Sequence, residues 1–283
     1  MNRIKKPRHV ESRDRSYSLF RRKIIALWVS SLSLSLISVT LLGSIGYTVP
    51  LVLISALLIY IILTLYHRTQ IESFHHYRQL EALTSIHALI KVRHPLPPMR
   101  IWAISPDFAL LVLSLVTINR PKHIVELGSG TSTLISSYAL QKIGEGKVTS
   151  LEHLAQFAKE SERGVAKHGF EGTATVVHAP LKTWEKDGQI WKWYDIKDKS
   201  ALDKIDLLIV DGPPGFTCKL ARYPALPELY DQLNEGAFIL VDDVMRDDET
   251  EMINRWLDEF NLEIVEIIPN EKGAAILRKT AAT

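Results

Sequence analysis

Hydrophobic side chains are unevenly distributed along the 283 residues of this chain. From Ile24 to Tyr66 no Asp, Glu, Lys or Arg interrupts a run rich in Leu, Ile, Val and Ser. As one helix the run would extend roughly 65 Å, about twice a hydrocarbon core. The stretch GSIGYTVP at 43–50 is typical of a turn. We therefore expect two transmembrane helices, Ile24–Leu42 and Val49–Tyr66, with a buried helical pair of a soluble domain as the alternative.

The charges that flank this run predict its orientation. Residues 1–23 hold nine Lys or Arg against one Asp and one Glu, and the turn at 43–50 holds none. Excess positive charge stays on the cytoplasmic side of a membrane. We expect a two-pass protein of the cell (inner or cytoplasmic) membrane, in contact with lipids through residues 24–66. Its N-terminal segment and everything after Tyr66 would then be cytoplasmic.

The pattern changes twice after the apolar run. Residues 67–99 predict a helical connector that ends in the proline-rich stretch RHPLPPMR. From residue 100 to 283, short apolar runs alternate with helical segments, which is typical of a doubly wound α/β fold. We expect a mainly parallel, seven-stranded, Rossmann-like sheet that ends in an antiparallel hairpin. The expected strands are HIVEL, KVTSLE, TATVVHA, IDLLIVD, GAFILVDD, LEIVEII and AAILRK.

Composition narrows the function classes. The 34 Lys and Arg nearly balance the 32 Asp and Glu, so we expect no nucleic-acid partner. One cysteine, Cys218, excludes an internal disulfide and a multi-cysteine zinc site. The sequence offers no obvious base to activate its thiol, so we do not expect it to act as a nucleophile. The sequence does not decide whether the protein forms a homo-oligomer.

Glycine or acidic residues follow most of the expected parallel strands. In open α/β sheets ligands bind outside the carboxyl ends of the strands, so these positions are the candidate site. In chain order they are Glu126, Gly128, Ser129, Gly130 and Thr131 after the first strand, Glu152 after the second, Ala179 after the third, Asp211 after the fourth, and Asp242 and Asp243 after the fifth.

The first of these turns does not fit a dinucleotide. The third glycine of G-x-G-x-x-G is replaced by Thr133, and Glu126 stands where a phosphate would be repelled. A carboxylate suits a positively charged amino group instead. Glu152, 24 residues after Gly128, can accept hydrogen bonds from both ribose hydroxyls. An amino acid joined to a nucleoside without phosphate describes S-adenosylmethionine.

The motifs VELGSGTST, SLE, IDLLIVDGPPG and FILVDDV resemble, in order and spacing, those of the class I S-adenosylmethionine-dependent methyltransferases. The resemblance covers about residues 100–283. It implies that Glu126, Gly128 and Gly130 cradle the methionine moiety, that Glu152 holds the ribose and that residues 179–181 flank the adenine. Ser129, Thr131 and Asp211 complete the expected cofactor set.

Asp211, Asp242 and Asp243 should converge, because they follow neighbouring strands. Three carboxylates repel one another unless they are protonated or bridged by a cation, and oxygen ligands favour Mg²⁺. The set resembles the metal ligands of catechol and of TylF/NovP-type sugar O-methyltransferases. The resemblance implies that these residues are catalytic and that a metal lowers the pKa of the acceptor hydroxyl. A solvated acid pair at the start of a helix is the alternative for residues 242–243.

The sequence departs from that pattern where related enzymes carry a base, two or three residues after the first Asp. Pro213 and Pro214 occupy these positions and cannot take a proton. Asp211, His178 and Lys219 remain as candidate bases.

Two further segments are expected near the site. Arg222 and Tyr223 either grip an acidic or sugar-like acceptor or pin their loop to the domain. The aromatic residues of 184–195 either stack on an acceptor or pack internally.

These patterns together predict a membrane-anchored methyltransferase that uses S-adenosylmethionine, assisted by Mg²⁺. Its reaction would be O-methylation of a hydroxylated small molecule, a glycan or a lipid-linked sugar. A non-catalytic, nucleoside-binding membrane scaffold or sensor is the alternative from another class. An aminopropyltransferase-like enzyme ranks below both.

Overall fold

The computed structural model describes residues 47–100, 102–199, 202 and 204–281, together with isolated positions between 26 and 43. The basic segment 1–23 lies outside these residues, as does most of the first expected span at 24–42. The described chain divides into two compact units, and the division falls between residues 77 and 78. Each unit is described by itself below.

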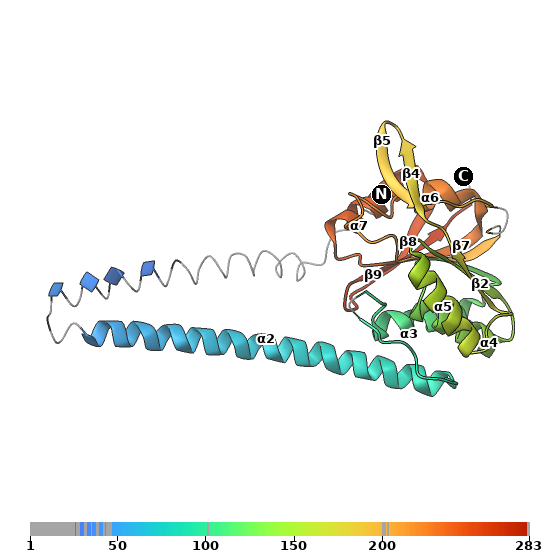
Figure 1. Cartoon of the computed structure of the whole chain (residues 1–283). Coiled ribbons are helices and arrows are strands. Elements are labelled where there is room, and N and C mark those ends of the chain that lie inside the picture. The colour runs from blue at the N-terminus through green and yellow to red at the C-terminus, as the bar shows by residue number, and fades with distance from the viewer. Residues whose placement is uncertain are drawn as a thin grey trace. The chain divides into compact units, whose positions relative to one another are not determined.

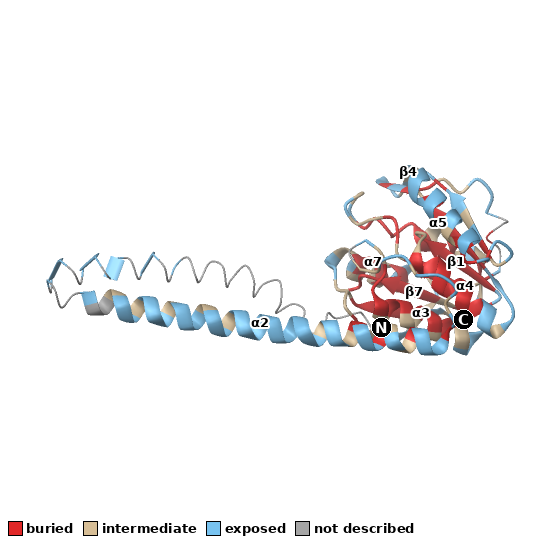
Figure 2. Ribbon diagram, turned by 60° about the horizontal axis from the view of Figure 1, so that its bottom comes forward, coloured by how far each residue is buried: buried red, intermediate tan, exposed pale blue. Residues whose placement is uncertain are grey.

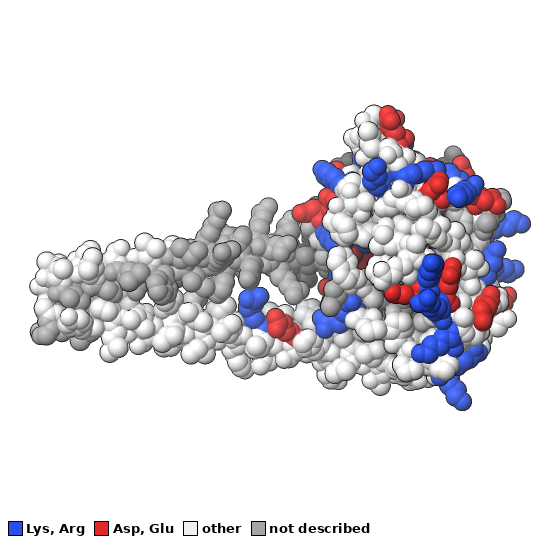
Figure 3. Space-filling model, in the orientation of Figure 1, with Lys and Arg blue, Asp and Glu red and all other residues white. Residues whose placement is uncertain are grey.

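A single helix, α2 (Thr48–Leu89), contains the second expected span and the expected connector as far as Leu89. Nothing in the sequence near Tyr66 breaks a helix, so the change from apolar to polar residues leaves no break in the backbone. Its part from Pro50 to Leu89 is long and apolar enough to cross a membrane, judged by length and composition alone. Figure 3 shows the uncharged side chains that cover the early turns of this helix. The two-pass arrangement itself stays a prediction.

The second unit, Arg78–Thr283, contains a seven-stranded sheet in the order β3-β2-β1-β6-β7-β9-β8. Figure 1 labels β2, β7, β8 and β9 of this sheet. Pairing is parallel from β3 to β7 and antiparallel from β7 through β9 to β8, as expected. The strands are β1 (His123–Leu127), β2 (Lys147–Glu152), β3 (Ala174–His178), β6 (Ile205–Val210), β7 (Leu233–Asp242), β8 (Leu262–Ile268) and β9 (Ala274–Lys279).

Helices cover both faces of the sheet, which explains why its central strands are almost continuously apolar. One core contains the residues on one face of β1 and β6, such as Val125 and Leu208, together with α6 (Ala225–Leu229) and α7 (Asp247–Glu259). The other core contains Ile124 and Leu207 with α3 (Pro106–Asn119), α4 (Thr131–Ile143) and α5 (Ala155–Lys167). Figure 2 shows these buried layers in red.

The final turns of α2 belong to the second core. Ala82 and Ile86 are buried, and the Gln79 side-chain amide donates to Asp107 at the start of α3 (2.9 Å). The connector therefore contributes to the folded domain, because its last turns supply part of the apolar layer beneath the sheet.

A two-stranded hairpin between β3 and β6 was not expected from the sequence. Strands β4 (Leu181–Lys186) and β5 (Gln189–Tyr194) pair antiparallel around a two-residue turn and stand out from the domain in Figure 1. Asp187 and Gly188 both have positive φ, 52° and 73°, as a type I′ hairpin turn requires. The alternative of internal packing is confirmed for Trp191 and Trp193, which are buried.

The segment before β7 contains one short helix and one 3-10 turn. Helix α6 ends at Leu229 and is followed by a 3-10 turn, η3 (Tyr230–Gln232). Strand β7 then begins at Leu233, three residues before the expected strand GAFILVDD.

The loop between β8 and β9 is tied to the start of α3. The backbone N–H of Glu271 donates to the Asp107 carboxylate at 2.8 Å, and Arg100 pairs with the Glu271 carboxylate at 2.8 Å. Gly273 has φ of 78°, and a side chain there would collide with Met245. These contacts hold Lys272 beside the ends of β6 and β7.

Candidate active site

The turn after β1 requires two glycines. Gly128 and Gly130 have φ of 105° and 148°, which side-chain-bearing residues rarely adopt. The N–H of Gly128 donates to the carbonyl of Leu151 on β2 (2.9 Å), which holds the turn against the neighbouring strand. Helix α4 then begins at Thr131. The turn therefore places backbone N–H groups at the carboxyl edge of the sheet.

Glu126, in β1, is completely buried beneath this turn. Its Oε2 accepts hydrogen bonds from the hydroxyls of Thr133 and Ser150, both at 2.6 Å. Burial raises the pKa of Glu126 to about 7, although the hydroxyls of Ser132, Ser150 and Thr133 oppose the shift. Near neutral pH this carboxyl therefore changes readily between its neutral and charged forms.

Glu152, at the end of β2, has the opposite character. Its Oε1 accepts from the N–H of Leu154 (2.9 Å) and lies 3.0 Å from His153 Nδ1, and its Oε2 accepts from the N–H of Ser129 (3.3 Å). Burial raises its pKa, but the hydrogen bonds from His153 and Leu154 outweigh burial and lower it. Glu152 is therefore a charged hydrogen-bond acceptor next to the glycine turn.

The three aspartates expected to converge do so. One carboxylate oxygen from each of Asp211, Asp242 and Asp243 lies within 4.8 Å of the others. Burial raises the pKa of Asp211 to about 6, with Arg222 opposing the shift and Asp243 adding to it. Asp242 is fully buried, and neither of its oxygens accepts a hydrogen bond from the described residues. Burial, followed by repulsion from Asp211 and Asp243, raises its pKa far above the ordinary value.

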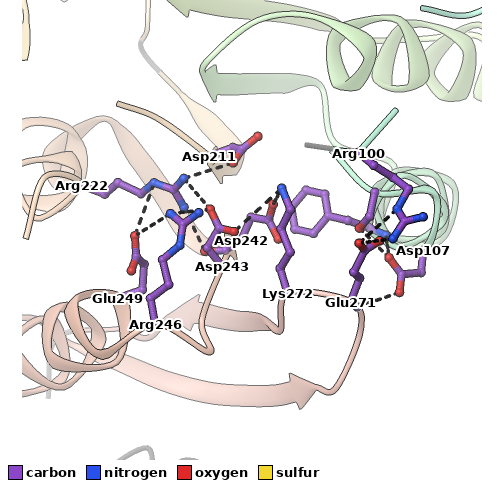
Figure 4. Close-up of polar contacts among 12 residues, drawn as sticks. Arg100, Asp107, Asp211, Arg222, Asp242, Asp243, Arg246, Glu249, Glu271 and Lys272 are labelled. Carbon is purple, nitrogen blue, oxygen red and sulfur yellow. Dashed lines mark hydrogen bonds and ion pairs between the residues drawn. The ribbon is translucent and has the colours of Figure 1, made fainter. Parts of the chain in front are cut away.

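Cations of the chain itself surround these acids (Figure 4). The buried guanidinium of Arg222 lies 2.8 Å from Asp243 Oδ2 and 3.3 Å from Asp211 Oδ1, and it also donates to the carbonyl of Asp242 (3.0 Å). Arg246 contacts Asp243 at 2.9 Å. Lys272 approaches Asp242 Oδ2 at 4.0 Å. The repulsion foreseen among the acids is therefore balanced in part by side chains that the strand-end motifs do not include.

A cavity of about 440 Å³ opens beside this cluster. Trp102 and Phe216, each 78% exposed, meet edge to face at its rim with ring centroids 5.9 Å apart. Asp211, Arg246 and Lys272 also line it. An acceptor would thus meet an apolar rim and a charged floor.

The candidate bases separate in the structure. Asp211 lies in the cluster, whereas His178 is exposed at the end of β3. Lys219 is exposed as well and faces Glu251 at 3.6 Å. Asp211 is therefore the candidate base that the fold places beside the cavity.

Arg222 and Tyr223 mainly hold their own loop against the rest of the domain. Arg222 edges the cavity, but its guanidinium is engaged by the acids described above. The Tyr223 hydroxyl donates to Glu259 of α7 (2.6 Å) and accepts from Lys186 at the hairpin (2.9 Å). Tyr223 is consequently a structural link between the hairpin and α7.

Sequence reasoning missed Arg246, Lys272 and Glu249 as neighbours of the site, and it expected Tyr194 near the site only as one of the aromatic residues of 184–195. No motif marks them, since each lies in a loop or element whose position depends on the whole sheet. The Asp-Gly turn between alternating residues was the one signal that could have placed Tyr194, by predicting the β4–β5 hairpin.

Comparison with known proteins identifies the domain. Residues 125–244 match the family described as a methyltransferase domain. The chain carries a methyltransferase domain. The sheet order and the glycine turn agree with the class I S-adenosylmethionine-dependent enzymes, so the resemblance seen in the sequence is confirmed.

Solved structures of other methyltransferases share the fold at low identity. The SAH-bound methyltransferase PaMTH1 of Podospora anserina is 14% identical with a TM-score of 0.53, over 76% of this chain and 96% of that one. The O-methyltransferase of Bacillus cereus in complex with SAH is 16% identical (TM-score 0.48, covering 71% and 90%). The O-methyltransferase TomG of Streptomyces achromogenes in complex with SAM is also 16% identical (TM-score 0.49, covering 64% and 82%). No curated protein sequence matches the chain significantly.

The side chains at the carboxyl edge of the sheet fit both expected ligands, S-adenosylmethionine and a divalent cation. The glycine turn, the carboxyl of Glu126 and the charged Glu152 suit the amino and ribose ends of S-adenosylmethionine. Asp242, with two buried oxygens that accept no hydrogen bond from the described residues, fits a hard divalent cation shared with Asp211 and Asp243. Arg222 already engages one oxygen of each of these partners, so such a cation would use the remaining oxygens.

The raised pKa of Glu126 predicts a stability loss with rising pH in the ligand-free protein. Unfolded, this carboxyl titrates near 4.5, and folded near 7. Its contribution is complete below the unfolded value and disappears as pH rises to about 7, amounting to roughly 3 kcal/mol. The Glu126→Gln variant should lose this part of the slope, while Asp211 retains its own. Urea unfolding of both proteins from pH 5 to 8 measures the difference, and parallel curves would contradict the assignment.

Proposed function

We propose that this protein is an O-methyltransferase that transfers the methyl group of S-adenosylmethionine to a hydroxyl of a small acceptor. The observation that carries the proposal is the cavity that opens onto Asp211 directly beside the glycine turn. The N–H of Asp211 donates to the carbonyl of Leu127 (3.2 Å), so the acid cluster and the turn share one sheet edge. A sulfonium and an acceptor could therefore lie in line, which is the main requirement of this displacement.

The cofactor would be held along the tips of β1, β2 and β3. Glu126 would receive the amino group, and Glu152 would accept hydrogen bonds from the ribose. The backbone of 128–131, which includes Ser129 and Thr131, would face the methionine moiety. Ala179, whose N–H donates to the carbonyl of Glu152 (2.8 Å), would border the adenine.

The acceptor would bind in the cavity between Trp102, Phe216 and the acid cluster. The two exposed rings offer apolar faces for a sugar or a flat ring, and Arg246 and Lys272 offer positive charge. Asp211, with a pKa near 6, is suited to take the proton of the acceptor hydroxyl at neutral pH. A glycan, a lipid-linked sugar or another hydroxylated small molecule fits this description.

Asp211, Asp242 and Asp243 would hold a divalent cation such as Mg²⁺. Bound there, the ion would lower the pKa of the acceptor hydroxyl and orient its oxygen. The residues of the chain retain their own tasks, since Arg222 keeps the acids together and Lys272 balances Asp242.

The apolar segment 24–66 would anchor the enzyme to a membrane, with its catalytic domain on the cytoplasmic side. The apolar half of α2 and the basic segment 1–23 support this proposal. A tethered active site gains effective concentration toward acceptors confined to the same surface.

One observation favours the non-catalytic alternative, a nucleoside-binding membrane scaffold. Two of the three candidate bases lie away from the acid cluster. His178 is exposed at the end of β3, and Lys219 is exposed and pairs with Glu251. Cofactor binding without methyl transfer to any acceptor would support the scaffold.

Glu152 provides the direct test of the cofactor site. Changing Glu152 to Gln removes the charge that would accept the ribose hydroxyls, and hydrogen bonds to charged groups are worth about 1.5–3 kcal/mol. We expect about 10- to 100-fold weaker binding of S-adenosylmethionine by calorimetry, and less labelled methyl transferred into a membrane extract. Glu160→Gln, on the exposed surface of α5, is the matched control and should bind like the parent. A parent protein that binds no S-adenosylmethionine would refute the function.

The metal proposal predicts a dependence on divalent cations. Activity should fall at least about tenfold in EDTA and return on addition of Mg²⁺, because the cation neutralises the acids around the acceptor oxygen. Asp242→Asn should raise the Mg²⁺ concentration needed for half-maximal activity, whereas Asp231→Asn, at an exposed position, should not. Full activity in EDTA would show that the acids work without a metal.

The membrane proposal can be checked by extraction. The full chain should remain with membranes after washing with alkaline carbonate, because removing its apolar segment from lipid exposes a long hydrophobic surface. A chain limited to Arg78–Thr283, the compact catalytic unit, should appear in the supernatant. Release of the full chain by carbonate would contradict membrane insertion.

A further inference from the structure

We infer that the hydroxyl of Tyr194 is a cofactor-binding group that donates a hydrogen bond to an oxygen of the bound nucleoside. The inference rests on the proposed function and adds to it a residue from outside the sequence motifs. Tyr194 is the last residue of β5, in the hairpin inserted between β3 and β6.

The Tyr194 ring reaches from the hairpin to the centre of the sheet edge. A side-chain carbon added to Gly212 would overlap the Tyr194 hydroxyl, and the same carbon would lie 3.1 Å from the carbonyl of Leu127 and 3.4 Å from the N–H of Gly128. The hydroxyl therefore lies close to the point where β1 enters the glycine turn. Its ring also meets that of His153, next to Glu152, with centroids 6.3 Å apart.

The hydroxyl has no hydrogen-bond partner among the described residues, and it is buried. A buried hydroxyl without a partner costs stability, and phenylalanine would fill the same space without that cost. The apolar residues of the same hairpin, such as Trp191, show that this part of the core accepts large hydrophobic rings. A bound ligand that accepts a hydrogen bond from the Tyr194 hydroxyl would remove this cost and explain why the position holds tyrosine.

The surroundings keep Tyr194 a hydrogen-bond donor. Burial, followed by the negative charge of Glu152 and then of Asp211, raises its pKa well above the ordinary value, so it stays protonated at neutral pH. Glu152 and Asp211, when ionised, can only accept hydrogen bonds. The ribose hydroxyls and the carboxylate of the methionine moiety are oxygens that need a donor in this acidic setting, and Tyr194 provides one.

Replacing Tyr194 by Phe tests the inference, because it removes only the hydroxyl. On the full chain in detergent, we expect about tenfold weaker binding of S-adenosylhomocysteine by calorimetry. The unfolding temperature of the ligand-free protein should be unchanged or higher, since no internal hydrogen bond is lost. A merely structural hydroxyl would give the reverse pair of results.

Tyr223→Phe is the matched control. Its hydroxyl is bonded to Glu259 and Lys186, so its removal should lower the unfolding temperature and leave the affinity unchanged. Titration with 5′-methylthioadenosine, which lacks the amino-acid end, then locates the contact. A loss for both ligands places the hydroxyl at the ribose, and a loss for S-adenosylhomocysteine alone places it at the carboxylate.

Two negative results have different meanings. If Tyr194→Phe binds both nucleosides as tightly as the parent, the inference is overturned while the proposed function stands. If the parent binds neither nucleoside, the proposed cofactor site itself fails.

Discussion

The carboxyl edge of the sheet depends on one buried guanidinium. Arg222 binds the carboxylates of Asp211 and Asp243, which follow β6 and β7, and donates to the backbone carbonyl of Asp242. Its Nε also lies 3.9 Å from the carboxylate of Glu249 in α7. Without this cation, acids from two strand ends and one helix would repel one another in a largely buried region at the base of the cavity. Removing one partner of a buried ion pair typically costs about 3–5 kcal/mol. The loop that carries Arg222 is thereby fixed to the strand ends that form the floor of the acceptor cavity.

The site has two halves with different electrostatics. On the β1–β2 side, Oε2 of Glu126 and both oxygens of Glu152 accept hydrogen bonds from hydroxyls, backbone N–H groups and an imidazole, and no arginine or lysine of the described residues pairs with them. On the β6–β7 side, full positive charges from Arg222, Arg246 and Lys272 accompany the acids. The first half suits a ligand that brings its own positive charge. The second half suits an oxygen that must lose a proton.

Much of this arrangement was accessible from the sequence, and the reason is local. Each parallel strand is a short apolar run, and its last residue determines what lies at the sheet edge, so the convergence of Asp211 with Asp242 could be predicted. The role of Arg222 could not, because a loop residue finds its partners only once β6, β7 and α7 are in place. The expected end of the second span at Tyr66 was based on the change from apolar to polar residues. A change in polarity does not end a helix without a helix-breaking residue, so α2 continues to Leu89. The β4–β5 hairpin was overlooked because its tryptophans suggested a binding rim.

In the proposed cofactor site, the titration of Glu126 would couple cofactor binding to the proton concentration. Burial raises its pKa to about 7, so the ligand-free carboxyl changes readily between its protonated and ionised forms near neutral pH. In the proposed cofactor site, an ammonium group against Glu126 would favour the ionised form, so each binding event would release part of a proton into solution. Acidification would then compete with the cofactor for the same carboxylate, and the affinity for the methyl donor would fall as the pH falls.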